Sequence, residues 1–166
     1  MRRTIGTACA LLLGILAFAP GARAAGGPRD FVTVGGQHLA SGVGPELVAA
    51  GVSARSGPSG EHPKGSFTFT ITGQGQHAFH AKVTCLIVVG NEAFATGRYT
   101  QPKSAAGHIV VLDAVDNGNP GRSSSPDLIR FSFEGSIVPV SPDCYLPLLP
   151  PVPVQRGNVV VHDATP

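Results

Sequence analysis

The sequence predicts an all-β domain built from about eight antiparallel strands. Short segments in which apolar and polar side chains alternate recur along the chain, and turn residues separate them. After residue 24, no stretch of useful length shows the apolar spacing of three and four residues that an amphipathic helix requires. We therefore expect an antiparallel meander that forms a small closed or partly closed barrel, with a β-sandwich as the alternative.

The predicted strands follow one another at short intervals. In chain order they are Phe31–Val34, Leu47–Ala54, Ser66–Thr72, Lys82–Val89, Glu92–Thr100, His108–Val115, Asp127–Ile137 and Asn158–His162. The segments between them contain Gly, Pro, Asn and Ser, as in Gly57-Pro58-Ser59-Gly60 and Asn117-Gly118-Asn119. No connection is long enough for a crossover helix, so the sheet is expected to be antiparallel.

Two of these strands have a clear inner face. Phe67 and Phe69 share one face of the third strand, and threonines occupy the other. Phe131 and Phe133 share one face of the seventh strand in the same way. The fourth strand, Lys82–Val89, is apolar on both faces, which is typical of a central strand.

Residues 1–24 have the pattern of a secretory signal peptide. Two arginines precede an apolar run from Ala8 to Phe18, and Ala22-Arg23-Ala24 provides a small-x-small cleavage site. The apolar run is shorter than the roughly 20 residues of a membrane-spanning helix. We predict cleavage before Ala25, secretion with the periplasm as the alternative location, and no membrane span after signal removal.

Removing the signal changes the charge of the chain. The full sequence has 12 Lys and Arg and 10 Asp and Glu, for a formal charge of +2. Arg2, Arg3 and Arg23 leave with the signal, so nine bases face ten acids and the formal charge becomes −1. No run of basic residues remains. We expect one domain over residues 25–166 that binds no nucleic acid, and its partner is not identified by the sequence.

Cys85 and Cys144 are the two cysteines that remain after Cys9 is removed with the signal. An even pair in an exported chain predicts a disulfide, worth about 3–4 kcal/mol in the chain-entropy model. The alternatives are two buried free thiols or a cysteine-based site. Cys85 lies in an apolar strand, which suits a structural residue better than a nucleophile.

Residues 138–154 are rich in both proline and apolar side chains. Six prolines argue against a regular central strand, and the apolar residues argue against a free linker. We expect a packed, partly polyproline-like loop tied at Cys144, which would shield Tyr145, Leu146, Leu148 and Leu149 from water. The alternative is a proline-rich ligand for a partner's aromatic groove.

Few residues suggest a ligand site. Asp116, Asn117 and Asn119 form an oxygen-rich cluster that could hold Ca²⁺, but Asn-Gly is also a strong turn former in its own right. The isolated histidines form no pair on one strand face, so we expect no metal and no cofactor. Phe67, Phe69, Phe131 and Phe133 are the candidate walls of a small apolar site, although such residues often only fill a small barrel.

Several segments in order resemble a group of small secreted bacterial proteins. They include Val34-Gly35-Gly36-Gln37-His38, Val83-Thr84-Cys85-Leu86, residues 115–121 and the closing residues 157–163. That group is all-β and uncharacterised, so the resemblance implies export and fold and carries over no catalytic residue.

No catalytic motif is visible in the chain. It has no Gly-x-Ser-x-Gly elbow, no phosphate-binding glycine loop and no carboxylate pair that spacing alone would select. The sequence therefore favours an exported, non-enzymatic β-domain with a binding or structural role. The alternatives are a carrier of a small apolar ligand in the barrel interior, and an enzyme whose residues converge only in three dimensions.

Overall fold

The computed structural model describes residues 28–39, 47–71, 78–118 and 125–164. The predicted signal peptide and Asn119 lie outside these residues. The described elements are β1 (Asp30–Leu39), β2 (Leu47–Ser56), β3 (Lys64–Ile71), β4 (Ala78–Val89), β5 (Glu92–Gln101), the 3-10 turn η1 (Lys103–Ala105), β6 (Ile109–Val115), β7 (Leu128–Phe133), β8 (Ile137–Ser141), β9 (Cys144–Pro147), β10 (Val152–Pro153) and β11 (Arg156–His162).

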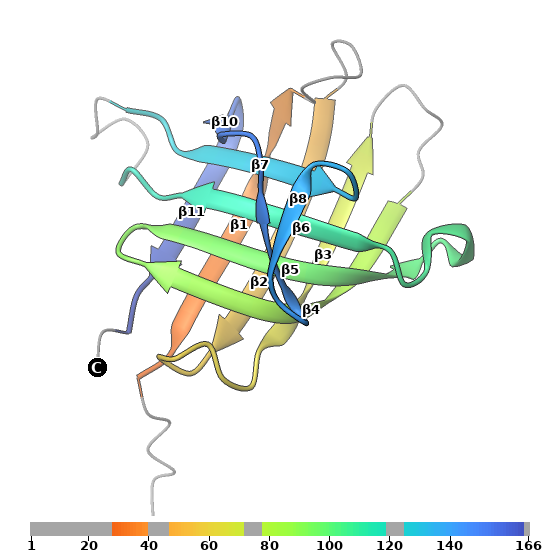
Figure 1. The fold of residues 1–166 in the computed structure, drawn as a ribbon. Helices are drawn as coiled ribbons and strands as arrows, with labels where there is room; N and C mark the ends of the chain where they lie inside the picture. The colour runs from red at the N-terminus through yellow and green to blue at the C-terminus, as the bar shows by residue number, and fades with distance from the viewer. Residues whose placement is uncertain (1–27, 40–46, 72–77, 119–124, 165–166) are drawn as a thin grey trace, which may run out of the picture.

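Nine of these strands form one antiparallel sheet in the order β10-β7-β6-β5-β4-β3-β2-β1-β11. From β1 to β7 each strand pairs with the next one in sequence, which confirms the predicted meander. The sheet curls into a half-barrel (Figure 1), so the all-β class and the partly closed barrel are also confirmed. Register shifts in β4, between His80 and Ala81 and between Val83 and Cys85, favour this curvature because bulges bend a strand.

The hydrophobic core lies on the inner face of the half-barrel. Phe67 and Phe69 point inward from β3 and are 0% and 2% exposed, as their alternation predicted. Small residues of β5 (Ala93, Ala95 and Gly97) also belong to this inner face. A Cβ atom on Gly97 would lie 2.7 Å from the ring of Phe67. The missing side chain of β5 therefore provides the volume that the large ring of β3 fills.

Aspartate carboxylates join the two ends of the curled sheet. The backbone N–H of Val159 in β11 donates to Oδ2 of Asp127 at 2.8 Å, and that of Val161 donates to Oδ2 of Asp116 at 3.1 Å. Both aspartates come from the connection between β6 and β7, near the opposite end of the sheet. The carboxylates thus supply acceptors for an edge strand that has no backbone neighbour on that side.

Two further aspartates hold the segment that follows β11. The N–H of Ala164 donates to Oδ1 of buried Asp30 at 2.9 Å, and Asp163 accepts from the N–H of Gly90 at 2.7 Å. Before β11, the N–H of Gln155 donates to a backbone carbonyl of β1 at 2.8 Å. The C-terminal strand is therefore fixed along its length to residues that are distant in sequence.

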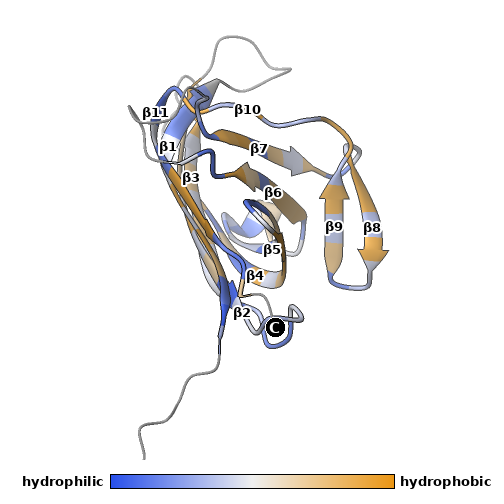
Figure 2. Cartoon of the chain, turned by 90° about the vertical axis from the view of Figure 1, so that its left-hand side faces the viewer, coloured by the Kyte–Doolittle hydropathy of each residue, from blue (hydrophilic) through white to orange (hydrophobic). Residues whose placement is uncertain are grey.

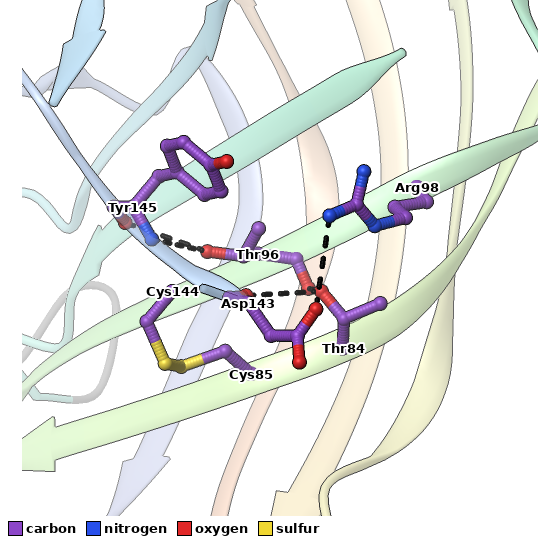
Figure 3. The surroundings of a disulfide bond; sticks show 7 residues. All are labelled: Thr84, Cys85, Thr96, Arg98, Asp143, Cys144 and Tyr145. Carbon is purple, nitrogen blue, oxygen red and sulfur yellow. Dashed lines mark hydrogen bonds and ion pairs between the residues drawn. A yellow bond between two sulfur atoms is a disulfide. The ribbon is translucent and has the colours of Figure 1, made fainter. Parts of the chain in front are cut away.

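The hairpin formed by β8 and β9 covers the outer face of the sheet near β4, β5 and β6 (Figure 2). A disulfide joins Cys85 of β4 to Cys144 of β9, with a Cα–Cα distance of 5.2 Å, which confirms the predicted pair. Polar contacts surround it (Figure 3). The hydroxyl of Thr96 accepts from the N–H of Tyr145 at 3.0 Å, and that of Thr84 donates to the carbonyl of Asp143 at 3.1 Å.

The proline-rich segment differs from the expected loop. Residues 137–147 form the β8–β9 hairpin, and residues 152–153 form β10 against β7. A two-stranded hairpin leaves half of the N–H groups of each strand unpaired, so its strands tolerate proline. Tyr145 and Leu146 are half-buried, but Leu148 and Leu149 are 58% and 52% exposed. The predicted shielding of these last two leucines is therefore wrong.

We expect Asp127→Ala to lower the free energy of unfolding by about 3 kcal/mol, because it leaves the N–H groups of Val159 and Asn117 without their acceptor. Denaturant titration measures this loss, and hydrogen exchange should show faster exchange at Val159. The control is Asp143→Ala, which removes a carboxylate that is 65% exposed and should cost about 0.5 kcal/mol. Equal losses in the two variants would show that the closure contributes little.

We expect Cys144→Ser to lower the free energy of unfolding by about 3 kcal/mol and to release the hairpin before the sheet unfolds. Limited proteolysis at residues 137–147 should then become faster, whereas Ser141→Ala in the same hairpin should leave the cleavage rate unchanged. Unaltered protease resistance in Cys144→Ser would contradict the role of the disulfide in holding the hairpin.

Candidate functional site

The candidate site is an apolar pocket at the end of the half-barrel where β3, β5 and β7 end and β4 and β6 begin. Its volume is about 320 Å³. It is lined by Phe69, Ile71, Phe79, Tyr99, Ala105, His108, Ile109, Phe133 and Glu134. Most of these residues come from strands whose inner faces build the core, so the pocket continues the core to the open end of the sheet.

Four aromatic rings form the wall of this pocket. The ring of Phe69 is stacked on that of Phe79, with centroids 5.0 Å apart and planes at 10°. Tyr99 meets both rings edge-to-face, at 5.7 Å and 5.8 Å. Phe133 lies 6.2 Å from Phe69 and is 41% exposed, which places it at the open side. Such an arrangement offers both faces and edges of rings to an apolar ligand.

A polar pair lies at the rim of the pocket. Nδ1 of His108 and Oε2 of Glu134 are 2.8 Å apart, and Oε1 of Glu134 accepts from the N–H of Ile109 at 3.3 Å. The hydrogen bond to His108 is the main reason that the pKa of Glu134 lies below its usual value. On the wall, burial raises the pKa of the Tyr99 phenol, so this group stays neutral. The pocket therefore presents charge at its rim and none on its wall.

The structure separates the four predicted phenylalanines into two groups. Phe69 and Phe133 line the pocket, whereas Phe67 and Phe131 lie deeper and fill the core. The sequence reading missed Phe79 because β4 begins at Ala78, four residues before the predicted strand. It also missed Tyr99. The alternation of Ala93, Ala95 and Gly97 on β5 could have indicated that Tyr99 points to the inner face.

Asp116 and Asn117 of the predicted metal cluster lie in the connection between β6 and β7, beside β11. Asp116 accepts from the N–H groups of Gly118 and Val161, at 2.8 Å and 3.1 Å. Asn117 donates its side-chain amide to the carbonyl of Pro126. These contacts give Asp116 and Asn117 a structural role in the turn. Within the described residues, no three His, Cys, Asp or Glu side chains are grouped closely enough to hold a metal ion.

Besides Tyr99, two other buried ionisable groups have strongly shifted pKa values, but they lie on opposite faces of the sheet. His38 points inward and contacts the ring of Phe131 at 5.4 Å, and burial lowers its pKa to about 4. Asp113 points outward from β6, and burial followed by the charge of Glu92 raises its pKa to about 7. Shifted groups often mark active sites, but groups on opposite faces cannot act together as an acid–base pair.

Comparison with known protein families, with curated protein sequences and with solved structures finds no match to this chain. The resemblance to small secreted bacterial proteins therefore stays a prediction. In the part of the chain that the structure describes, no helix has the length and apolar character needed to cross a membrane.

Asp113 predicts a measurable pH dependence of stability. The pKa of this residue rises from 3.8 to about 7 on folding, so the unfolded chain loses its proton first as the pH increases. The folded state should therefore lose up to about 4 kcal/mol of stability between pH 4 and pH 7 from this group.

We expect Asp113→Asn to be more stable than the native chain at pH 8 and similar to it at pH 4. Thermal or denaturant unfolding at both pH values measures the difference. His38 acts in the opposite sense, because its lowered pKa costs stability as the pH falls from about 6.5 to 4. That term is present in both proteins and cancels in the comparison. A stability difference that does not vary with pH would contradict a buried, protonated Asp113.

Proposed function

We propose that this chain is an exported, non-enzymatic binding domain that holds a small apolar ligand in the aromatic pocket at the end of its half-barrel. The observation that carries the proposal is the wall formed by Phe69, Phe79, Tyr99 and Phe133, which borders about 320 Å³ of space. Pockets of this size, with apolar walls and a few polar groups, are typical of small-molecule sites.

The packing supports a ligand at the end of the barrel rather than in its interior. Phe67 is fully buried, and Phe131 packs against it edge-to-face at 6.4 Å. Together with Phe69 these rings fill the space that a carrier with a central cavity would keep open. A ligand therefore reaches the outer rings, and its own polar group would lie near His108 and Glu134.

The remaining features support export and a binding role. The disulfide is typical of an oxidising compartment, and the signal pattern of residues 1–24 points to secretion, with the periplasm as the alternative. The titratable pair at the rim, His108 and Glu134, is exposed, and the remaining hydroxyl of the lining, on Tyr99, is kept neutral by burial and is therefore a weak nucleophile. The pocket can therefore hold a molecule more readily than it can transform one.

We expect the apolar dye N-phenyl-1-naphthylamine to bind with micromolar affinity and to quench the fluorescence of Tyr99. The chain has two tyrosines and no tryptophan, so Tyr145→Phe leaves Tyr99 as the reporter inside the pocket. In that background, Phe133→Ser should weaken binding about tenfold, because it removes an aromatic wall worth about 1.4 kcal/mol.

The control for this experiment is Val140→Ser, which changes an apolar residue of β8 that is 51% exposed and lies outside the pocket. Its dye affinity should equal that of the parent. Equal weakening by both substitutions, or dye binding that does not saturate, would refute the pocket as a specific site.

A further inference from the structure

The outer face of the sheet has an unusual charge distribution. The outward-pointing side chains of β11, β1, β2, β3 and β4, which we name the outer basic face, include four Lys and Arg residues and two histidines. These are Arg55, Lys64, Lys82, Arg156, His80 and His162. No Asp or Glu points outward from the described residues of these five strands. In Figure 2 the β8–β9 hairpin lies on the opposite wall of the half-barrel, and it reaches this face only at β4, where Cys144 is bonded to Cys85.

The basic residues are placed next to one another across the strands. Arg55 and Lys64 are directly opposite in β2 and β3, and Lys82 is opposite Arg98 of β5. Like charges in opposite positions destabilise a sheet. Arg98 has a partner in Asp143 of the hairpin, at 3.7 Å. Among the described residues, no carboxylate forms an ion pair with Arg55, Lys64 or Lys82. The repulsion between these bases therefore destabilises the sheet and is not offset by an ion pair within the chain.

One edge of the face adds further positive charge. At the turn between β2 and β3, a depression of about 500 Å³ is lined by Arg29, Arg55 and Lys64 and by one acid, Glu61. The carboxylate of Glu61 is directed to the backbone, where it accepts from the N–H of Ser59 at 2.8 Å. The bases at this edge therefore dominate the local potential.

Two neighbouring glycines leave open space in the middle of the face. Gly35 and Gly51 are directly opposite in β1 and β2, and a Cβ atom on either would meet nothing within 4 Å. Neither has a positive φ, unlike Gly157, whose φ of +119° favours glycine. Packing and backbone geometry therefore do not require Gly35 and Gly51. Glycine inside a strand weakens it and often marks the close approach of a ligand.

Gly51 also lines a wide trough across the strands, whose other lining residues are mostly small or polar but include Phe69. Its volume is about 540 Å³, and Gln37, Gly51, Thr68, Thr70 and Arg156 are among its lining residues. Hydroxyl and amide groups of this kind form hydrogen bonds with hydroxylated ligands. Five strands spaced at about 4.8 Å give the face a width of roughly 20 Å, which suits an extended polymer better than a compact molecule.

We propose that the outer basic face binds a linear anionic polysaccharide that lies over the trough and the bases beside it. Its carboxylates would pair with Arg156 in the trough and with Lys82 and Lys64 further along the strands, and its hydroxyls would meet the threonines and Gln37. A single-stranded nucleic acid fits less well, because such sites use aromatic rings as stacking platforms. The aromatic ring that the described outer face offers is Phe31, which is already stacked on His162 at 5.1 Å.

The test is binding of the chain to immobilised polygalacturonate, with neutral dextran and single-stranded DNA as competitors. Binding should weaken as the salt concentration rises, because the charges are exposed. The double substitution Lys64→Gln and Lys82→Gln should weaken binding about tenfold. Lys103→Gln, which removes an exposed lysine of η1 away from the face, should change it less than about twofold.

Gly51→Thr tests the trough without changing charge. The open space and ordinary φ at this position predict unchanged or higher thermal stability, since threonine favours strands. Polygalacturonate affinity should nevertheless fall about tenfold or more, whereas Phe133→Ser in the aromatic pocket should leave it unchanged.

Four outcomes would overturn the proposal. They are an affinity for dextran equal to that for polygalacturonate, tighter binding of DNA, equal weakening by Lys103→Gln and the double variant, and undiminished binding by a folded Gly51→Thr protein. The aromatic pocket lies on the inner side of the sheet, so this proposal does not depend on it. Failure of the dye experiment would contradict the aromatic pocket as a ligand site and would leave the polysaccharide proposal standing.

Discussion

The hydrogen bonds from β11 to Asp116 and Asp127 are the constraint on which the rest of the structure depends. A curled nine-stranded sheet that does not close leaves edge strands, and exposed edges invite pairing with other chains. Here the carboxylates accept the N–H groups of Val159 and Val161 directly. This closure fixes β11 beside β1, which completes the outer face. It also fixes the inner face, since Val159 packs into the core at 1% exposure.

A second constraint is the exchange of volume between strands inside the half-barrel. Gly97 and the alanines of β5 are small where Phe67 is large, and a Cβ on Gly97 would collide with that ring. This compensation ends at Tyr99, where β5 places a large ring beside Phe69 and Phe79. Aromatic rings that come together at the end of the sheet cannot all be covered, and the uncovered surface forms the pocket. The candidate site is thus a consequence of how the core ends.

Local patterns were sufficient to predict the strands but not the contacts between distant segments. The alternation of β3 and β7 is a property of a few neighbouring residues, and so the eight predicted strands are present, although the seventh ends at Phe133 and Ile137 begins β8. The cysteine count predicted the disulfide because two cysteines follow the predicted signal peptide, and two cysteines have one intramolecular pairing available. Asp116 was ambiguous, because its partner Val161 is 45 residues away and no local signal connects them. The hairpin of β8 and β9 was missed because proline content disfavours central strands but not an isolated two-stranded ribbon.

The charge of the chain illustrates the same limit. Without the predicted signal peptide, ten acids face nine bases and there is no basic run, which indicates no charged surface. Strand alternation nevertheless scatters the bases along the sequence at positions that the sheet then brings together. The acids are used differently: Asp30, Asp116 and Asp127 accept backbone N–H groups and so leave the outer surface. Because these aspartates bind backbone N–H groups that hold the ends of the sheet, the bases are in excess on the outer face. The net charge of the chain therefore does not predict the charge of the outer face. The aspartate contacts that stabilise the fold also leave that face positively charged.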